Sequence, residues 1–133
     1  MVNVSLGGRS VITPELEDAL LHEDEILITT YDTDNKPGTV PIWFVYTEGK
    51  VYVATGRNSA KTLKLQTNPR VRLSFAGNKN RAIEGKGRIC TEKMLVARVA
   101  PILNQKYRQA WGPDTRMVER LLEGDIVLIE VTP

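Results

Sequence analysis

The chain has 133 residues, of which 41% are hydrophobic and 26% charged, so it is long enough for one domain with one buried core. It contains no apolar run of membrane-spanning length, and Cys90 and His22 are its only cysteine and histidine. This excludes a transmembrane helix, an internal disulfide and a metal site with several imidazoles. No linker divides residues 1–133 and no apolar signal segment opens them, which predicts a single cytoplasmic domain.

The first half of the chain predicts one helix followed by three strands. Thr13 and Pro14 are typical of a helix N-terminus, and apolar residues then recur at helical spacing. Residues that favour β-structure predict strands over 26–31, 39–46 and 50–55, joined by turns over 32–38 and 47–49. Pro41 cannot donate a ladder hydrogen bond, which favours an edge strand, a bulge or a position beside a ligand.

The second half predicts further helices and three more strands. Ser59 is typical of a helix N-cap, and the Asn-Pro pair at 68–69 stops the short helix expected over 59–66. Thr91 is expected to cap a helical region that is kinked or divided at Pro101 and has an apolar stripe of Met94, Leu95, Val99, Ile102 and Leu103. A last helix is expected from Asp114 to Gly124. The remaining strands are predicted over 70–76, 82–90 and 126–131, with a turn over 77–80.

Short strands joined by hairpin-length connections favour an antiparallel barrel with flanking helices over a parallel sheet. Charge along this chain is uneven, although the formal net charge is only +2. Between Arg57 and Arg88 there are nine basic residues and one acidic residue, whereas the rest of the chain has nine basic and fifteen acidic residues. Such a basic segment attracts anions, but solvated positions on alternating strands remain an open alternative.

The segment over 54–64 has the groups that a phosphate needs. A predicted strand ends, Gly56 permits close backbone approach, and the first turn of the next helix offers free N–H groups. Hydroxyl groups and cations follow within the same segment, from Thr55, Arg57, Ser59, Lys61 and Lys64. The spacing is neither a Walker loop nor a dinucleotide-binding glycine motif, so an ordinary capped surface helix is the open alternative.

A second segment combines bulky apolar residues with a proline: Val40, Pro41, Ile42 and Trp43. One interpretation is a strand whose backbone groups face a planar ligand. The other is ordinary barrel core.

The order of these motifs resembles a known superfamily. Thr-Val-Pro-Ile-Trp-Phe, Val-Tyr-Val-Ala-Thr-Gly, Ser-Ala-Lys-Thr-Leu-Lys and Glu-Gly-Lys-Gly-Arg-Ile follow one another as in the pyridoxamine 5'-phosphate oxidase-like, FMN-binding split β-barrels. The resemblance covers about residues 13–131 and is strongest to the flavin- and deazaflavin-dependent oxidoreductases. It implies a mainly β fold with flanking helices, namely a six-stranded antiparallel split β-barrel. It also implies a homodimer with FMN, or alternatively the deazaflavin F420, at the subunit interface.

The resemblance also assigns binding roles. It implies that Thr55, Ser59 and Lys61 bind the cofactor phosphate, with Arg57 and Lys64 as further cations. Val40, Pro41, Ile42 and Trp43 would lie along the cofactor ring, mostly through backbone groups, with Trp43 and Trp111 as candidate aromatic walls.

No catalytic side chain and no metal site are predicted. His22 and the carboxylates at 23–25 and 32–34 are interpreted as solvated groups, and Cys90 as a buried thiol. The predicted function is an oxidoreductase in which the flavin or deazaflavin exchanges a hydride with a small organic substrate. The alternative is a non-catalytic flavin carrier or sensor. A nucleic-acid partner is disfavoured, because Phe75 is the only aromatic residue of the basic segment.

Overall fold

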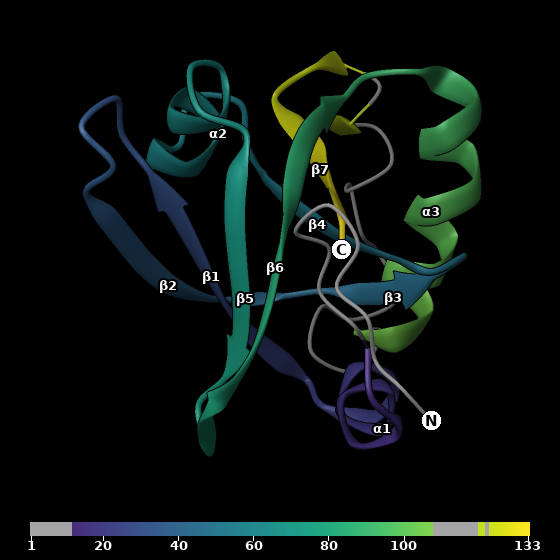
Figure 1. Cartoon of the computed structure of the whole chain (residues 1–133). Coiled ribbons are helices and arrows are strands. Elements are labelled where there is room, and N and C mark those ends of the chain that lie inside the picture. The colour runs from purple at the N-terminus through teal and green to yellow at the C-terminus, as the bar shows by residue number, and fades with distance from the viewer. Residues whose placement is uncertain (1–11, 108–119, 122) are drawn as a thin grey trace.

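Figure 1 traces a computed structural model of the chain, in which strands dominate and helices flank them. The structure describes residues 12–107, 120–121 and 123–133, with the backbone alone at 78–80. The elements follow as α1 (Pro14–His22), β1 (Glu25–Tyr31), β2 (Pro37–Trp43), β3 (Val45–Thr47), β4 (Lys50–Gly56), α2 (Ala60–Leu65), β5 (Arg70–Phe75), β6 (Asn78–Cys90), α3 (Lys93–Lys106) and β7 (Ile126–Thr132). The predicted class, mainly β with flanking helices, is confirmed.

The strands form one antiparallel sheet in the order β2-β1-β5-β6-β7-β4-β3. Its two edges, β2 and β3, are separated in the chain by Phe44 alone. Two edges joined by one residue lie close together at that point, so the sheet curls into a half-barrel, although β2 and β3 do not pair with each other. The result is the split barrel that the sequence predicted, with α2 at one end and α1 at the other (Figure 1).

The number of strands differs from the prediction of six. One continuous strand was expected over 39–46, but β2 pairs with β1 as far as Trp43, and β3 pairs with β4 from Val45 onward. Phe44 belongs to neither ladder, because the chain passes there from one edge of the sheet to the other. The described residues therefore form seven strands.

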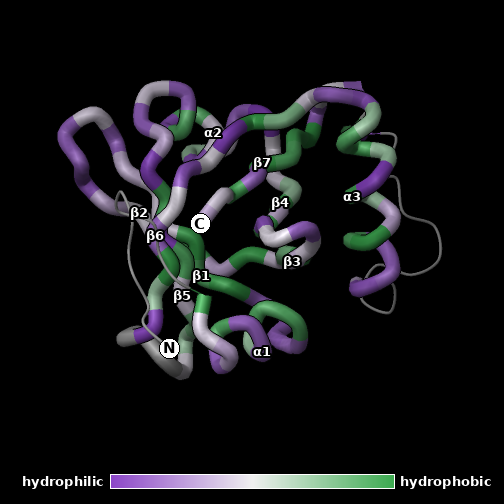
Figure 2. Tube along the Cα trace, turned by 45° about the vertical axis from the view of Figure 1, so that its right-hand side comes forward, coloured by the Kyte–Doolittle hydropathy of each residue, from purple (hydrophilic) through white to green (hydrophobic). Residues whose placement is uncertain are grey.

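Two apolar clusters lie on the two faces of this sheet. The first fills the barrel interior and is closed by Leu16 and Leu20 of α1 and by Leu65 of α2. The second lies outside the barrel, where α3 covers alternate residues of the neighbouring strands, such as Tyr52 and Leu128. Figure 2 shows hydrophobic strand segments in the interior and hydrophilic residues at the hairpin ends. None of the described helices is long and apolar enough to cross a membrane.

The predicted helix starts are partly confirmed. Thr13 and Ser59 cap α1 and α2 through side-chain oxygens that accept backbone N–H groups. Thr91 does not cap α3, whose N-cap is Glu92, without a side-chain hydrogen bond to the helix. The helix runs through Pro101 without dividing. The predicted stripe is also too wide, because Met94 is 84% exposed and Ile102 is exposed as well, whereas the other three members are buried.

Two turns have the backbone conformation that their residues suggest. Glu48 and Gly49 both have positive φ, at 55° and 74°, which is the two-residue hairpin turn that matches strand twist. Gly124 has φ 91° and donates its N–H to Arg120 O, so it ends the preceding helical turn as predicted. The turn expected over 77–80 is shorter, because β6 already begins at Asn78. The proposed cap Asp114 lies outside the described residues.

Candidate functional site

The candidate phosphate segment lies where β4 ends at Gly56 and α2 begins at Ala60. Ser59 has extended backbone angles (φ −66°, ψ 158°), and its Oγ accepts the N–H of Thr62 at 3.3 Å. Ser59 N–H donates to Gly56 O at 3.0 Å and closes the turn between strand and helix. The segment therefore has the strand–turn–helix form that the sequence predicted.

Three hydroxyl groups in this segment form one hydrogen-bonded chain. Thr55 Oγ1 donates to Ser59 Oγ at 3.2 Å, and Ser59 Oγ lies 3.0 Å from Thr62 Oγ1. Thr62 Oγ1 donates to Gly56 O at 2.9 Å, so the proton between Ser59 and Thr62 must come from Ser59. Thr62 belongs to α2 and is only 1% exposed, so the row of hydroxyl groups ends at a buried side chain. The sequence reasoning missed Thr62, although its position three residues after the N-cap was a usable signal.

The two lysines of α2 differ in their surroundings. Lys61 is half-buried, and burial lowers the pKa of its ammonium from the usual value. A nearby anion would favour the charged form again. Lys64 extends from α2 to β2: a Cβ atom at Gly38 would lie only 2.5 Å from Lys64 Nζ. Lys64 thus brings a positive charge to the start of the candidate ring-binding strand.

Arg57 lies towards another part of the chain. Its backbone N–H donates to Asp125 O at 3.0 Å, and a Cβ atom at Gly124 would lie 3.7 Å from its guanidinium Nη1. The side chain is exposed. The structure therefore places Arg57 against the turn before β7, while Thr55, Ser59, Lys61 and Lys64 belong to the strand end and α2.

Val40, Pro41, Ile42 and Trp43 lie in β2, at an edge of the sheet. Val40 is 40% exposed and Pro41 is exposed, whereas Ile42 and Trp43 are partly buried. Of the three positions expected for Pro41, the structure shows the edge strand. Ordinary barrel core describes only part of this segment: Ile42 packs against the interior cluster and Trp43 against the cluster under α3, whereas Val40 and Pro41 are exposed.

Residues after the predicted site segments contact this strand at its end. The Trp43 ring stacks on the Tyr107 ring, with centroids 4.5 Å apart and planes 2° from parallel. Tyr107 Oη and Lys106 Nζ both bond the backbone of Phe44. Burial raises the pKa of Tyr107 to about 12, so its phenol stays protonated at neutral pH. Sequence reasoning missed both residues, and Trp111, the other candidate wall, lies outside the described residues.

The only histidine and cysteine are where the sequence expected them. His22 is exposed, and its Nδ1 lies 2.9 Å from Asp18 O and 3.2 Å from Asp18 Oδ1. Cys90 is buried, and burial raises the pKa of its thiol to about 11. Asp32 accepts the N–H groups of Asp34 and Lys36 within a turn, as predicted for a turn carboxylate. Over the described residues, no group of three His, Cys, Asp or Glu side chains could hold a metal ion.

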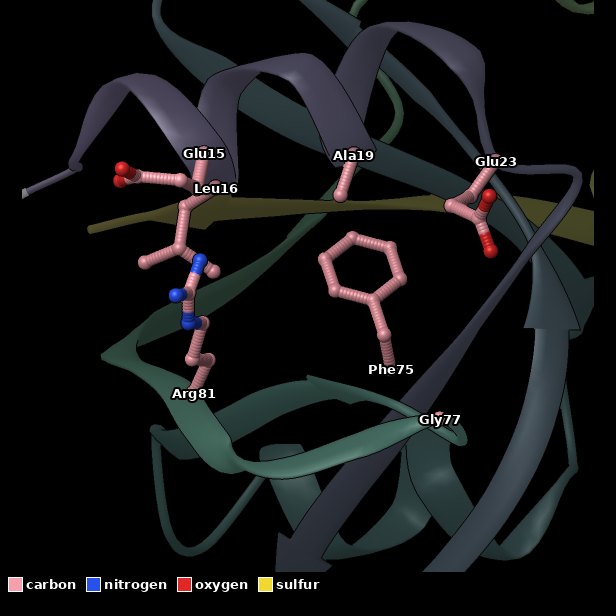
Figure 3. Close-up of a pocket in the computed structure, with 7 residues that line it drawn as sticks. All are labelled: Glu15, Leu16, Ala19, Glu23, Phe75, Gly77 and Arg81. Carbon is pink, nitrogen blue, oxygen red and sulfur yellow. The ribbon is translucent and has the colours of Figure 1, made fainter.

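A pocket of about 170 Å³ lies apart from the phosphate segment, between α1 and the β5–β6 hairpin (Figure 3). Its walls are Glu15, Leu16, Ala19, Glu23, Phe75, Gly77 and Arg81. Phe75 forms an apolar floor, with Glu15 and Arg81 at one end and Glu23 at the other. None of the predicted site residues lines this pocket. Its volume is also below the roughly 300–1,000 Å³ typical of pockets for drug-sized ligands.

The curled antiparallel sheet places this protein in the class of split β-barrel domains. Its candidate site is a basic, hydroxyl-rich turn beside an exposed edge strand. The sequence model of the family described as pyridoxamine 5'-phosphate oxidase matches residues 12–133. The chain belongs to this family. No curated protein matches the chain.

Solved structures share the fold at low sequence identity. A conserved hypothetical protein from Mycobacterium tuberculosis is 19% identical, with 98% of this chain and 85% of that chain covered and a TM-score of 0.72. A structure named F420 reductase is 22% identical, with 88% and 91% covered and a TM-score of 0.63. An FAD-binding protein from Mesorhizobium loti is 16% identical, with 91% and 88% covered and a TM-score of 0.62. At these identities the likeness concerns the fold alone.

Proposed function

We propose that this protein is a flavin- or deazaflavin-dependent oxidoreductase that exchanges a hydride with a small organic substrate. One observation carries the proposal: Lys64 Nζ lies against Gly38, so the candidate phosphate segment and the candidate ring-binding strand are neighbours in space. The two contacting residues, Gly38 and Lys64, are 26 positions apart in the sequence. A cofactor with a phosphate at one end and a planar ring at the other needs such a pairing. Membership of the pyridoxamine 5'-phosphate oxidase family supports the same proposal.

The donor set at the strand end fits a phosphate group. Lys61 and Lys64 supply two positive charges, and their spacing of three residues puts them on neighbouring positions of α2. Thr55 and Ser59 supply hydroxyl groups that can turn from their internal chain towards an anion. Charge-assisted hydrogen bonds of this kind are about twice as strong as neutral ones.

The edge strand fits a planar ring. Val40 is an exposed aliphatic residue on a strand whose outer edge carries no neighbouring strand in the described sheet. An apolar surface beside free backbone N–H and C=O groups can hold a ring by its face and its polar edge at once. In this proposal Val40, Pro41, Ile42 and Trp43 orient the ring, and a second copy of the chain covers the other side.

When bound, FMN or F420 would supply the hydride chemistry. The residues of the chain then have binding and orienting roles: Lys61 and Lys64 hold the phosphate, and β2 fixes the ring. No side chain of the chain is assigned to proton transfer. The alternative, a carrier or sensor that binds flavin without turnover, uses the same site and differs in activity alone.

The test begins with the small molecule that co-purifies with the protein. Its absorbance spectrum and mass identify FMN or F420, and titration of the cofactor-free protein with each gives the affinity. We expect Lys64→Ala to weaken binding about tenfold, whereas Lys93→Ala, on an exposed lysine of another helix, leaves it unchanged. Absence of binding to both cofactors would overturn the proposal. Binding without oxidation or reduction of the bound cofactor by any tested donor or acceptor would favour the carrier.

A further inference from the structure

The backbone of Phe44 needs partners that no strand provides. Phe44 lies between the β1–β2 ladder and the β3–β4 ladder, and its side chain is fully buried. A buried backbone N–H or C=O without a hydrogen bond is destabilising. The Phe44 N–H donates to Tyr107 Oη at 2.8 Å, and Phe44 O accepts from Lys106 Nζ at 2.9 Å. The end of α3 therefore takes the place of a neighbouring strand.

One phenol ties three segments together at this point. Tyr107 Oη lies 2.8 Å from Phe44 O and 2.7 Å from Asp24 O, but it has only one proton to donate. Since Lys106 already donates to Phe44 O, donation to Asp24 O leaves every one of these groups paired. Tyr107 then accepts from the β2–β3 junction and donates to the α1–β1 connection.

The same two residues also hold aromatic rings. Tyr107 stacks on Trp43, and the Lys106 ammonium lies 3.7 Å from the centroid of the Phe44 ring. Trp43 is the last residue of β2 and belongs to the segment that the proposed function places along the cofactor ring. Backbone and side chain at the end of this strand are thus fixed by one pair of residues from α3.

We propose that Lys106 and Tyr107 are positioning residues of the cofactor site, which act through Phe44 and Trp43 on the ring-binding strand. This inference rests on the proposed function. It adds residues more than sixty positions further along the chain than the strand they hold. A strand held at its end keeps its backbone groups in place for the ring, and a loosened strand loses part of that preorganisation.

The test removes one hydrogen-bonding group at a time and keeps the rest of each side chain. Tyr107→Phe keeps the stack on Trp43 but removes the hydroxyl, and Lys106→Met keeps the stem but removes the donor. We expect both variants to bind FMN or F420 about three- to tenfold more weakly and to shift the absorbance band of the bound cofactor. The Phe44 amide is expected to exchange hydrogen faster in Tyr107→Phe. Lys106→Arg, which keeps a donor, should restore most of the affinity.

Leu95→Ala is the control for a general loss of stability. Leu95 is buried near the other end of α3, so its truncation destabilises the helix packing without touching Phe44. We expect Leu95→Ala to lower the melting temperature at least as much as Tyr107→Phe while cofactor affinity stays within about twofold. Unchanged binding in Tyr107→Phe, or equal weakening in Leu95→Ala, would overturn the positioning role. Failure of the wild-type protein to bind either cofactor would instead overturn the proposed function.

Discussion

Ser59 and Lys61 lie in the same turn, but the structure gives them different roles. Ser59 caps α2 and takes part in the hydroxyl chain, so its oxygen contributes to the fold before any ligand binds. Lys61 is half-buried, and burial lowers the pKa of its ammonium. Burial of this charge therefore opposes folding. Substitution of Ser59 should therefore affect both cofactor binding and folding stability, whereas substitution of Lys61 should weaken cofactor binding alone.

Lys61→Ala should weaken cofactor binding and leave the cofactor-free protein at least as stable as before. Loss of one charge-assisted hydrogen bond is worth about 1.5–3 kcal/mol, roughly a tenfold to hundredfold loss of affinity. Alanine and lysine are both good helix formers, so the helix itself is not weakened. Titration with FMN and F420 measures the first effect and thermal unfolding the second. Wild-type affinity in this variant would show that the phosphate lies elsewhere.

Ser59→Ala should lower both the cofactor affinity and the stability of the cofactor-free protein. Removal of an N-cap costs about 1 kcal/mol of folding free energy, and the Thr55 hydroxyl loses its acceptor as well. Denaturant unfolding of the cofactor-free variant measures this loss, and the same titration measures binding. A variant with weaker binding and unchanged stability would argue against the capping role.

The sequence grouped correctly the candidate phosphate residues that are close together along the chain. The strand end, the N-cap and the lysines lie within ten residues, so spacing alone placed them in one segment. Tyr107 and Lys106 could not be found in this way, because the hydrogen bonds that link them to Phe44 span more than sixty residues. Arg57 was close in sequence, yet its side chain lies against Gly124.

At the scale of elements, the split between β2 and β3 is the clearest departure from the sequence prediction. Residues 39–46 are mostly bulky and, apart from Pro41, favour strand, and no glycine marks a break at Phe44. The break follows from closure of the barrel, which local sequence does not encode. At Pro101 the sequence predicted a kink or a break in the helix, but α3 continues through it. The helix packs Val99, Ala100 and Leu103 against the sheet, and this packing outweighs the local effect of the proline.

Another element-level feature is the buried carboxylate of Glu130, which joins β4, β6 and β7. Its side chain accepts from Tyr52 Oη at 2.9 Å and from Arg88 Nε at 3.3 Å, with Lys50 Nζ 3.6 Å away. Burial alone would raise the pKa of Glu130, but the hydrogen bonds from Tyr52 and Arg88 and the charge of Lys50 hold it below its usual value. Burial also raises the pKa of Tyr52 to about 12.

This carboxylate should make the fold sensitive to acid. Its folded-state pKa is lower than its unfolded value, so its contribution is present above the unfolded pKa and is lost as pH falls through the folded pKa. Glu130→Gln should cost about 1–3 kcal/mol at neutral pH and flatten the decline of stability below about pH 5. Denaturant unfolding at several pH values between neutral and about 3 measures both. Parallel pH profiles for the variant and the wild type would contradict this role.

At the scale of the whole molecule, an exposed edge strand and a small barrel favour self-association. β2 is an unpaired edge in the described sheet and carries exposed Val40, a combination that proteins usually cover. Val40 and Pro41 lie exposed on β2, so a ring bound there needs further surface to cover its other side. We therefore expect a homodimer with the cofactor at the interface. Sedimentation at micromolar concentration with FMN or F420 bound measures this, and a monomer under those conditions would contradict it.

The position of β7 in the sheet has a consequence for how the chain folds during synthesis. β7 pairs with β6 on one side and with β4 on the other, and so joins the β2-β1-β5-β6 strands to the β4-β3 hairpin. Both of its neighbours are made earlier, β4 some seventy residues before it. Until residues 126–132 leave the ribosome, the growing chain consists of two strand groups with open edges and no shared ladder. Formation of the complete sheet therefore waits for β7, and the nascent protein exposes unpaired edges of β4 and β6 until then.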